Sequence, residues 1–220
     1  MKKYAQTYNC PFQNSCRFVR EIREREKYMA TTQPIKDQKA ISAIKNYYLK
    51  EQKNFRNYAI FVIGINTALR IGDILTLTWN DVYQFNLKQF RNHIVVTEHK
   101  TGKENVIAMN ESVIDALKIY QSSLSSIAPE HFIFSGRDPQ KPLSRSQVYR
   151  IIKDACHKLQ LPENISCHSL RKTFGYHAWA AGTDPVVLMF IFNHSDFQIT
   201  KRYLGIDQDD KDSVFLHINL

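Results

Sequence analysis

The sequence CHSLRK, residues 167–172, places His168 and Arg171 three positions apart in a segment with helical character. Residues three apart project from one face of a helix, so both side chains can reach one small anion. Ser166 directly precedes this segment and is a suitable helix cap. In isolation the two residues would be read as solvated surface groups, so their meaning depends on the segments around them.

Four further segments carry residues of the same chemical kind. Downstream are FNHS (192–195) and TKRY (200–203), and upstream are LRIGD (69–73) and HKTG (99–102). A guanidinium suits a phosphate because its planar fork donates two charge-assisted hydrogen bonds at once. A set with two such groups suits the task of holding a phosphodiester between cations while a phenol attacks it. In chain order the set is Arg70, Lys100, His168, Arg171, His194 and Tyr203.

The order and spacing of these six residues resemble the catalytic domain of the tyrosine recombinases, the phage integrase family, over about residues 37–205. The resemblance implies that Arg70 and Arg171 grip the scissile phosphate and that Asp73 orients Arg70. It also implies that His194 hydrogen-bonds the phosphate. Tyr203, nine residues after His194, is then the nucleophile that forms a 3′-phosphotyrosyl intermediate.

Two of these assignments keep alternatives. His168 either takes the phenol proton or holds the phosphate oxygens. The general acid implied by the resemblance is a hairpin lysine, which matches Lys100, with Lys103 as its competitor; we take Lys100, the first lysine of the segment. The family usually has glycine before its second histidine, where this chain has Asn193. Asparagine tolerates the left-handed backbone better than most residues, so we expect the turn to survive.

The remaining sequence predicts a mainly helical fold with a small antiparallel β-sheet, an α+β class that agrees with the tyrosine recombinase catalytic-domain fold. Residues 93–98 and 105–109 are rich in β-branched side chains and flank a turn in which Gly102 can take a positive φ. The helical segments, read from apolar spacing and capping residues, start after Asp37 and then cover about 55–69, 71–77, 112–125, 145–160, 167–181 and 185–192.

The chain divides into a basic N-terminal segment and linker (1–36), the catalytic region (37–205) and an acidic tail (206–220). Residues 1–56 carry 13 Lys and Arg against 5 Asp and Glu, so +8 of the net charge of +9 lies in the first quarter. That excess predicts contact with a polyanion, with a solvated helix face as the equal alternative. Family integrases usually carry a helical core-binding domain before the catalytic one. About 36 residues are too few for it, so we predict a short form.

Composition and the N-terminal sequence indicate in which cellular compartment the protein acts. The apolar share of 43% is ordinary, and the apolar stretch at 58–65 is far too short to span a membrane. The N-terminus has no apolar run behind its lysines, so we predict a cytoplasmic, DNA-associated protein without a membrane partner. We expect Cys10 and Cys16 to be reduced thiols, with a metal knuckle as the lesser alternative, and Cys156 and Cys167 to fill apolar positions.

The resemblance implies site-specific cleavage and rejoining of double-stranded DNA without metal, ATP or other cofactor. It also implies a homotetramer on paired sites, with accessory DNA-bending or directionality proteins, and a C-terminal tail that docks on a neighbouring subunit. A non-cutting DNA-binding regulator on the same scaffold is the main alternative. Lesser ones are a type IB topoisomerase-like enzyme and a helical scaffold protein unrelated to DNA. Whether the outcome is integration, excision, inversion or resolution stays open.

Overall fold

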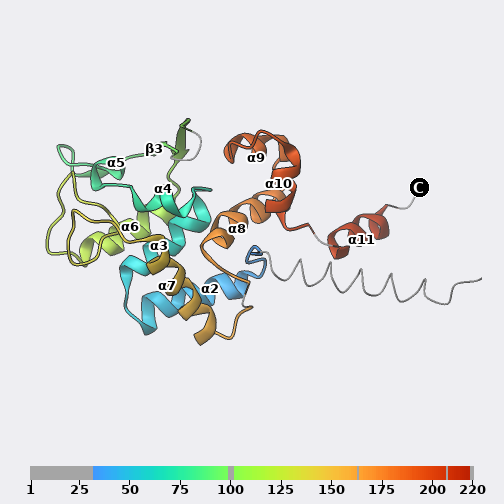
Figure 1. The fold of residues 1–220 in the computed structure, drawn as a ribbon, viewed down its shortest axis with the longest axis horizontal. Helices are drawn as coiled ribbons and strands as arrows, with labels where there is room; N and C mark the ends of the chain where they lie inside the picture. The colour runs from blue at the N-terminus through green and yellow to red at the C-terminus, as the bar shows by residue number, and fades with distance from the viewer. Residues whose placement is uncertain (1–31, 99–101, 163, 207, 219–220) are drawn as a thin grey trace, which may run out of the picture. The chain divides into compact units, whose positions relative to one another are not determined.

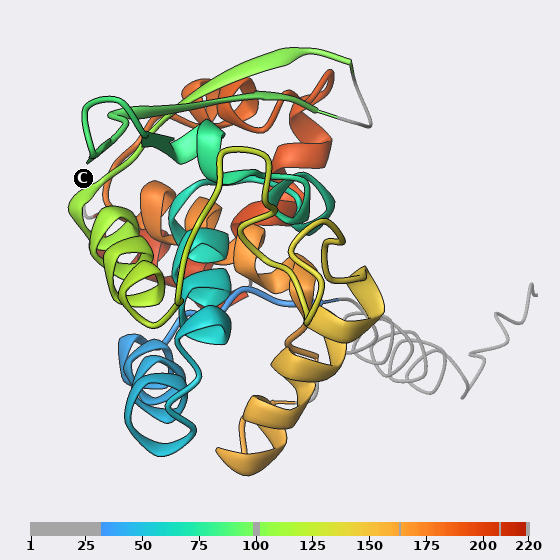
Figure 2. The same ribbon diagram turned by 90° about the vertical axis from the view of Figure 1, so that its left-hand side faces the viewer.

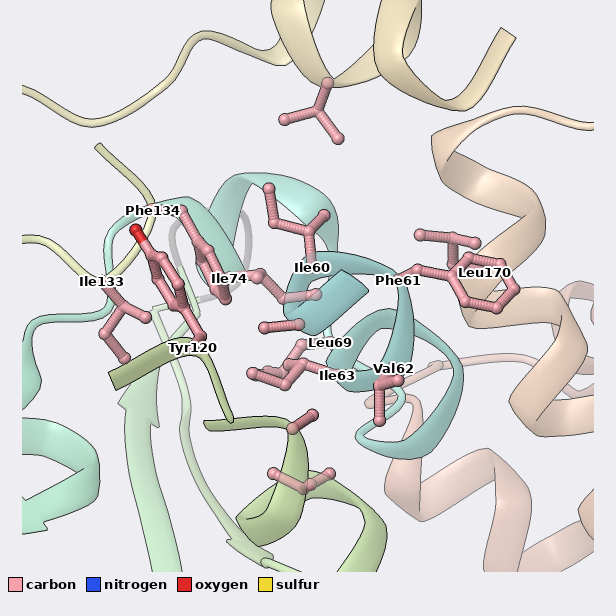
Figure 3. Packing of buried hydrophobic residues seen from close by; sticks show 14 of the residues in the cluster. Ile60, Phe61, Val62, Ile63, Leu69, Ile74, Tyr120, Ile133, Phe134 and Leu170 are labelled. Atoms are coloured by element: carbon pink, nitrogen blue, oxygen red, sulfur yellow. The ribbon is translucent and has the colours of Figure 1, made fainter. Parts of the chain in front are cut away.

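Helix α3 (Phe55–Asn66) lies at the centre of the computed structural model, which describes residues 32–98, 102–162, 164–206 and 208–218 (Figures 1 and 2). Residues 59–63 of α3 are at most 1% exposed. A helix that is apolar on every side must be covered on every side. The covers are α6 (Glu111–Ser122) and α8 (Cys167–Ala180). Figure 3 shows Phe61 of α3 beside Leu170 of α8, with Ile133 and Phe134 on the other side of α3.

The predicted α+β class is confirmed. The described residues form helices and two separate two-stranded antiparallel sheets, β1–β2 and β3–β4. The further helices are α2 (Gln38–Asn46), the π-helix η1 (Tyr47–Glu51), α4 (Ile71–Leu75), α5 (Trp79–Val82), α7 (Arg145–Lys158), α9 (Pro185–Ile191), α10 (Phe197–Leu204) and α11 (Gln208–His217). The strands are β1 (Tyr83–Gln84), β2 (Gln89–Phe90), β3 (His93–Thr97) and β4 (Glu104–Ala108).

Side-chain caps explain where several helices begin. Asp37 accepts a hydrogen bond from the Lys39 N–H at 2.8 Å, as the sequence predicts. Asp184 accepts one from the Val186 N–H at 2.7 Å, and Pro185 is the first helical residue, where the sequence predicts this helix to begin. Asp196 caps α10 through the Gln198 N–H at 2.8 Å. Each cap satisfies a backbone donor that has no partner inside its helix.

The end of α3 differs from the prediction in a way that shapes the site. The helix stops at Asn66 rather than near residue 69. The Thr67 hydroxyl donates to the Ile63 carbonyl at 2.8 Å, and Ala68 takes a left-handed conformation with φ of 57°. This turn redirects the chain, so that Arg70 becomes the N-cap of α4. The π-helix η1 and the strand pair β1–β2 were not predicted either.

The β3–β4 hairpin follows the predicted pattern. Its register pairs Val95 with Val106, and Gly102 has a φ of 65°. The base of the turn is closed by two backbone bonds, from the Gly102 N–H to the Glu98 carbonyl (2.8 Å) and from the Glu98 N–H to the Lys103 carbonyl (2.9 Å). Glu98 therefore lies where β3 ends and the turn begins.

A second, smaller core holds α9 and α10 against α8. Its buried members are Ala68, Leu188, Phe192 and Leu204. Gly175 permits this close packing, because a Cβ there would lie 2.8 Å from the Phe192 ring. The arrangement brings the two C-terminal helices that carry the predicted site residues directly onto the helix that carries His168 and Arg171.

Residues 33–220 form one compact unit, and its first residues are already tied to α8. Ile35 is 3% exposed, its N–H donates to Thr173 Oγ1 at 2.8 Å, and its carbonyl lies 2.9 Å from His177 Nε2. Next to this segment, Gly205 takes a φ of 61°, and a Cβ on it would lie 2.6 Å from the Pro34 ring. The chain thus enters the unit beside the point where α10 ends.

Other predictions fall partly or wholly outside the described residues. The basic segment up to residue 31, with Cys10 and Cys16, lies outside them. Cys156 is buried and Cys167 is packed against the core, as expected. Burial raises the pKa of the Cys167 thiol to about 11. Among the described helices none is both long and apolar enough to cross a membrane.

Candidate active site

A cleft of about 710 Å³ opens where the starts of α4, α7 and α8 meet. Two of the predicted cations, Arg70 and Arg171, line it together with His168. Arg145, the first residue of α7, also lines the cleft and was not predicted. Three guanidinium groups around one cleft favour an anionic ligand.

Arg70 reaches the cleft from the N-terminus of α4 and is 21% exposed at its side chain. Its Nη1 forms an ion pair with Glu98 Oε2 at 2.5 Å, and the Glu98 side chain is fully buried. The resemblance implied Asp73 as the orienting acid. Asp73 is 2% exposed, and its backbone N–H donates to the Arg70 carbonyl at 2.9 Å. Burial lowers the pKa of Arg171, and the negative charge of Asp73 offsets a small part of that lowering.

Sequence reasoning missed Glu98. The available signal was its position, an acidic residue at the end of a β-branched strand and two residues before Lys100. Arg145 also carried a signal, because it follows Ser144, a cap that accepts a bond from the Gln147 N–H at 3.2 Å. The Arg145 guanidinium lies against Gly72, where a Cβ would be 2.5 Å from its Nη2.

Arg171 lies beneath the cleft and is only 1% exposed. Its Nη1 donates to the Ala68 carbonyl, and its Nη2 donates to the Phe192 carbonyl at 2.7 Å. The guanidinium carbon lies 4.8 Å from the centre of the Phe192 ring. Burial and then the charge of Arg70 lower its pKa to about 10, which leaves it protonated at neutral pH. Arg171 therefore joins α8 to the turn after α3 and to the end of α9.

Tyr203 lies among the other predicted residues. Its ring centre is 4.9 Å from that of His168, 4.6 Å from that of His194 and 5.2 Å from that of Phe192. The guanidinium carbon of Arg171 lies 5.8 Å from the ring centre. Residues from α8, the α9–α10 turn and α10 thus meet around one phenol, and three of the six predicted residues are its direct neighbours.

His194 is held in place by two contacts. Its Nδ1 lies 3.0 Å from Thr200 Oγ1, and its ring stacks on Phe192 with centres 5.2 Å apart. Asn193 has a φ of 51°, which is the left-handed conformation that asparagine tolerates and that this turn was predicted to need. Burial, followed by the charges of Arg171 and Arg70, lowers the pKa of His194 to about 4. The imidazole is therefore neutral at pH 7.

The hairpin lysine cannot be placed in the same way. Lys100 lies outside the described residues, and Lys103 is exposed at the start of the return strand. The choice between them stays a prediction. The ion pair between Glu98 and Arg70 nevertheless brings the base of this hairpin to the cleft. Within the described ranges no group of three His, Cys, Asp or Glu side chains is arranged to hold a metal ion.

The lowered pKa of His194 gives a prediction for stability. The unfolded chain binds a proton near the ordinary value of 6.5, whereas the native state binds it only near 4. The unfolding free energy should therefore fall as pH drops from 6.5 towards 4, and His194→Gln should remove this part of the loss. Urea unfolding at several pH values measures it. His157→Gln, at the exposed end of α7, is the matched control and should behave as the wild type does. Equal pH dependence in the wild type and His194→Gln would contradict the prediction.

Solved structures share this fold. XerA recombinase superposes with a TM-score of 0.69 at 19% identity, over 87% of this chain and 66% of that one. XerH site-specific recombinase, in a post-cleavage complex with a palindromic difH substrate, gives 0.66 at 15% identity over 82% and 50%. The fold is thus that of the catalytic part of site-specific recombinases.

The chain belongs to the phage integrase family, which matches residues 31–209. The probable integrase/recombinase YoeC of Bacillus subtilis (strain 168) is 40% identical over 181 residues, covering 82% of this chain and 93% of the relative. Tyrosine recombinase XerA of Pyrococcus horikoshii is 24% identical over 153 residues, covering 70% and 51%. The chain spans about half the length of that recombinase and nearly all of YoeC.

Proposed function

We propose that this chain is a tyrosine site-specific recombinase that cleaves and rejoins double-stranded DNA. The observation that carries the proposal is the placement of Tyr203 against His168 and His194, with Arg171 behind its ring. The Tyr203 oxygen attacks a backbone phosphorus. A phosphorus–tyrosine ester forms, and the bond from phosphorus to the 5′ oxygen breaks. Relatives named as recombinases support this reaction.

Each cation has a role in this step. Arg70 and Arg171 stabilise the negative charge that develops on the non-bridging oxygens. His194 is neutral, and its Nδ1 contact with Thr200 leaves Nε2 free to carry a proton and donate it to a phosphate oxygen. His168 either receives the phenol proton or holds the same oxygens. Lys100, the hairpin lysine, protonates the leaving 5′ oxygen.

The second step reverses the first. The 5′ hydroxyl of a partner strand attacks the phosphotyrosine, the phosphorus–tyrosine bond breaks, and Tyr203 recovers its proton. One phosphate ester replaces another at each step, so the exchange conserves bond energy and consumes no ATP. Integration, excision and inversion all use this chemistry, and the arrangement of the two DNA sites selects among them.

Strand exchange between two duplexes requires several subunits, and we propose a homotetramer on paired sites in the cytoplasm, joined by accessory DNA-bending or directionality proteins. The exposed surface of helix α11 supports the assembly of several subunits. Its exposed apolar residues include Phe215 (78% exposed) and Leu216 (83%), which suits a segment that docks on another subunit. On α9, Phe190 is 70% exposed and offers an apolar surface of the kind such a segment would cover.

Disrupting α11 should therefore separate DNA binding from assembly. With Phe215→Asp and Leu216→Asp together, we expect one subunit to bind a single site normally, while the slow-migrating complexes that hold two sites decrease by about tenfold or more. Native gel electrophoresis on the target duplex measures both species. His217→Ala, in the same turn, is the control. Unchanged paired-site complexes in the double variant would contradict a docking role for α11.

Covalent trapping tests the function as a whole. The wild type and Tyr203→Phe are expressed in the native host, protein–DNA adducts are isolated under denaturing conditions, and the attached DNA is sequenced. We expect adducts at a discrete site in the wild type and none in the variant. If no adduct forms while gentle crosslinking still enriches a defined sequence, the chain is a DNA-binding regulator rather than a recombinase.

A further inference from the structure

Glu98 is a fully buried acid paired with Arg70, which lines the cleft, and the proposed reaction does not use the negative charge of Glu98. Its Oε2 lies 2.5 Å from Arg70 Nη1, and its Oε1 lies 3.5 Å from Asn105 Nδ2. The ion pair fixes the direction of Oε2, and Asn105 is a more distant, weaker neighbour of Oε1. Burying a carboxylate is costly unless it is paired, so this arrangement holds Arg70 in one orientation.

The backbone of the same residue controls the hairpin turn. The Glu98 carbonyl accepts from the Gly102 N–H at 2.8 Å, and the Glu98 N–H donates to the Lys103 carbonyl at 2.9 Å. Glu98 therefore contacts Arg70 through its side chain and the return side of the hairpin through its backbone.

The charge of Glu98 reaches the rest of the site as well. It raises the pKa of both Arg171 and His194, opposing the effects of burial and of the neighbouring arginines. A negative charge at this point also repels a phosphate that enters the cleft. Glu98 therefore weakens the binding of DNA before cleavage, while it keeps Arg70 oriented for the reaction.

We infer that Glu98 is a positioning residue for strand cleavage, which sets Arg70 at the scissile phosphate and ties it to the base of the β3–β4 hairpin. This inference rests on the proposed function. Its distinguishing consequence is a split between affinity and rate, because positioning and repulsion act on different steps. Loss of a residue that only supports the fold would lower both together.

Glu98→Gln tests this split, since the amide keeps the shape and removes the charge. We expect the variant to bind a 30-base-pair duplex of arbitrary sequence about two- to tenfold more tightly, measured by fluorescence anisotropy. On the duplex recovered by covalent trapping, single-turnover adduct formation should slow by about 10²-fold. Glu98→Asp keeps the charge but shortens the reach, and it should slow cleavage without tightening binding.

Glu104→Gln is the matched control. Glu104 is an exposed acid on β4 of the same hairpin, so its loss changes the net charge equally and should leave the cleavage rate unchanged. An unchanged rate in Glu98→Gln, with an active wild type, would overturn the inference alone. Slower cleavage with weaker binding in both Glu98 variants would mean a structural role and would overturn it too. A wild type that forms no adduct would overturn the proposed function first.

A double variant shows whether Glu98 acts through Arg70. In an Arg70→Lys background the fork that Glu98 orients is already lost, so adding Glu98→Gln should slow cleavage by less than about threefold further. A further loss of about 10²-fold, equal to the single variant's effect, would mean that the two residues act independently and that the positioning role is wrong.

Discussion

Tyr203→Phe is expected to abolish the covalent protein–DNA adduct while leaving DNA affinity unchanged. The variant lacks the only atom of the side chain that can bond to phosphorus, so the rate of adduct formation should fall by at least about 10⁴-fold. The ring keeps its neighbours His168, His194 and Phe192, so the fold should persist. Denaturing gels of purified protein with the target duplex measure the adduct, and anisotropy measures the affinity.

Tyr176→Phe is the control for this experiment. Tyr176 lies on the same helix as His168, and its ring contacts Trp179 and the Lys36 ammonium rather than the cleft. It should form adducts as the wild type does. If Tyr203→Phe still formed the adduct, another side chain would be the nucleophile, and peptide mapping of the adduct would locate it.

Arg171 should show the largest combined effect on rate and stability. Arg171→Lys keeps the positive charge, but a single ammonium cannot replace the planar fork that reaches both the Ala68 and the Phe192 carbonyls. We expect cleavage to slow by about 10²–10³-fold. Arg171→Ala leaves both buried carbonyls without their donor and should cost about 2–4 kcal/mol of unfolding free energy in addition.

Single-turnover cleavage and urea denaturation measure these two effects. Arg91→Lys is the matched control, because Arg91 also donates to a backbone carbonyl, that of Asn80 at 2.9 Å, but lies outside the cleft. Arg91→Lys should leave both the cleavage rate and the unfolding free energy close to those of the wild type. A fully stable Arg171→Ala would show that the two carbonyl bonds contribute little. A fully active Arg171→Lys would exclude a forked contact with phosphate.

Much of the fold and of the site followed from local sequence signals. The helix starts after Asp37 and at residue 185 were predictable because a short polar side chain before an apolar run satisfies the first free N–H groups. The turn at Asn193 was predictable because few residues take the left-handed conformation. The meeting of His168, His194 and Tyr203 followed from the family resemblance rather than from any local pattern.

The features of the fold and of the site that were not predicted depend on contacts between distant segments. The pairing of Arg70 with Glu98 joins residues 28 positions apart, and the position of Glu98 at the end of a strand does not by itself identify its partner. The burial of Arg171 depends on how α9 packs against α8, whereas its own segment, taken in isolation, favoured a solvated arginine. The early end of α3 coincides with the left-handed backbone at Ala68, which follows Thr67 and which alanine rarely adopts.

Pro34 and Gly205 bring the two ends of the region that carries the candidate site side by side. The segment before α2 and the end of α10 meet at one place, where a Cβ on residue 205 would lie 2.6 Å from the proline ring. A region whose ends adjoin can be joined to other segments at either end without stretching its core. Segments on either side of this junction can thus change while the residues of the candidate site keep their positions.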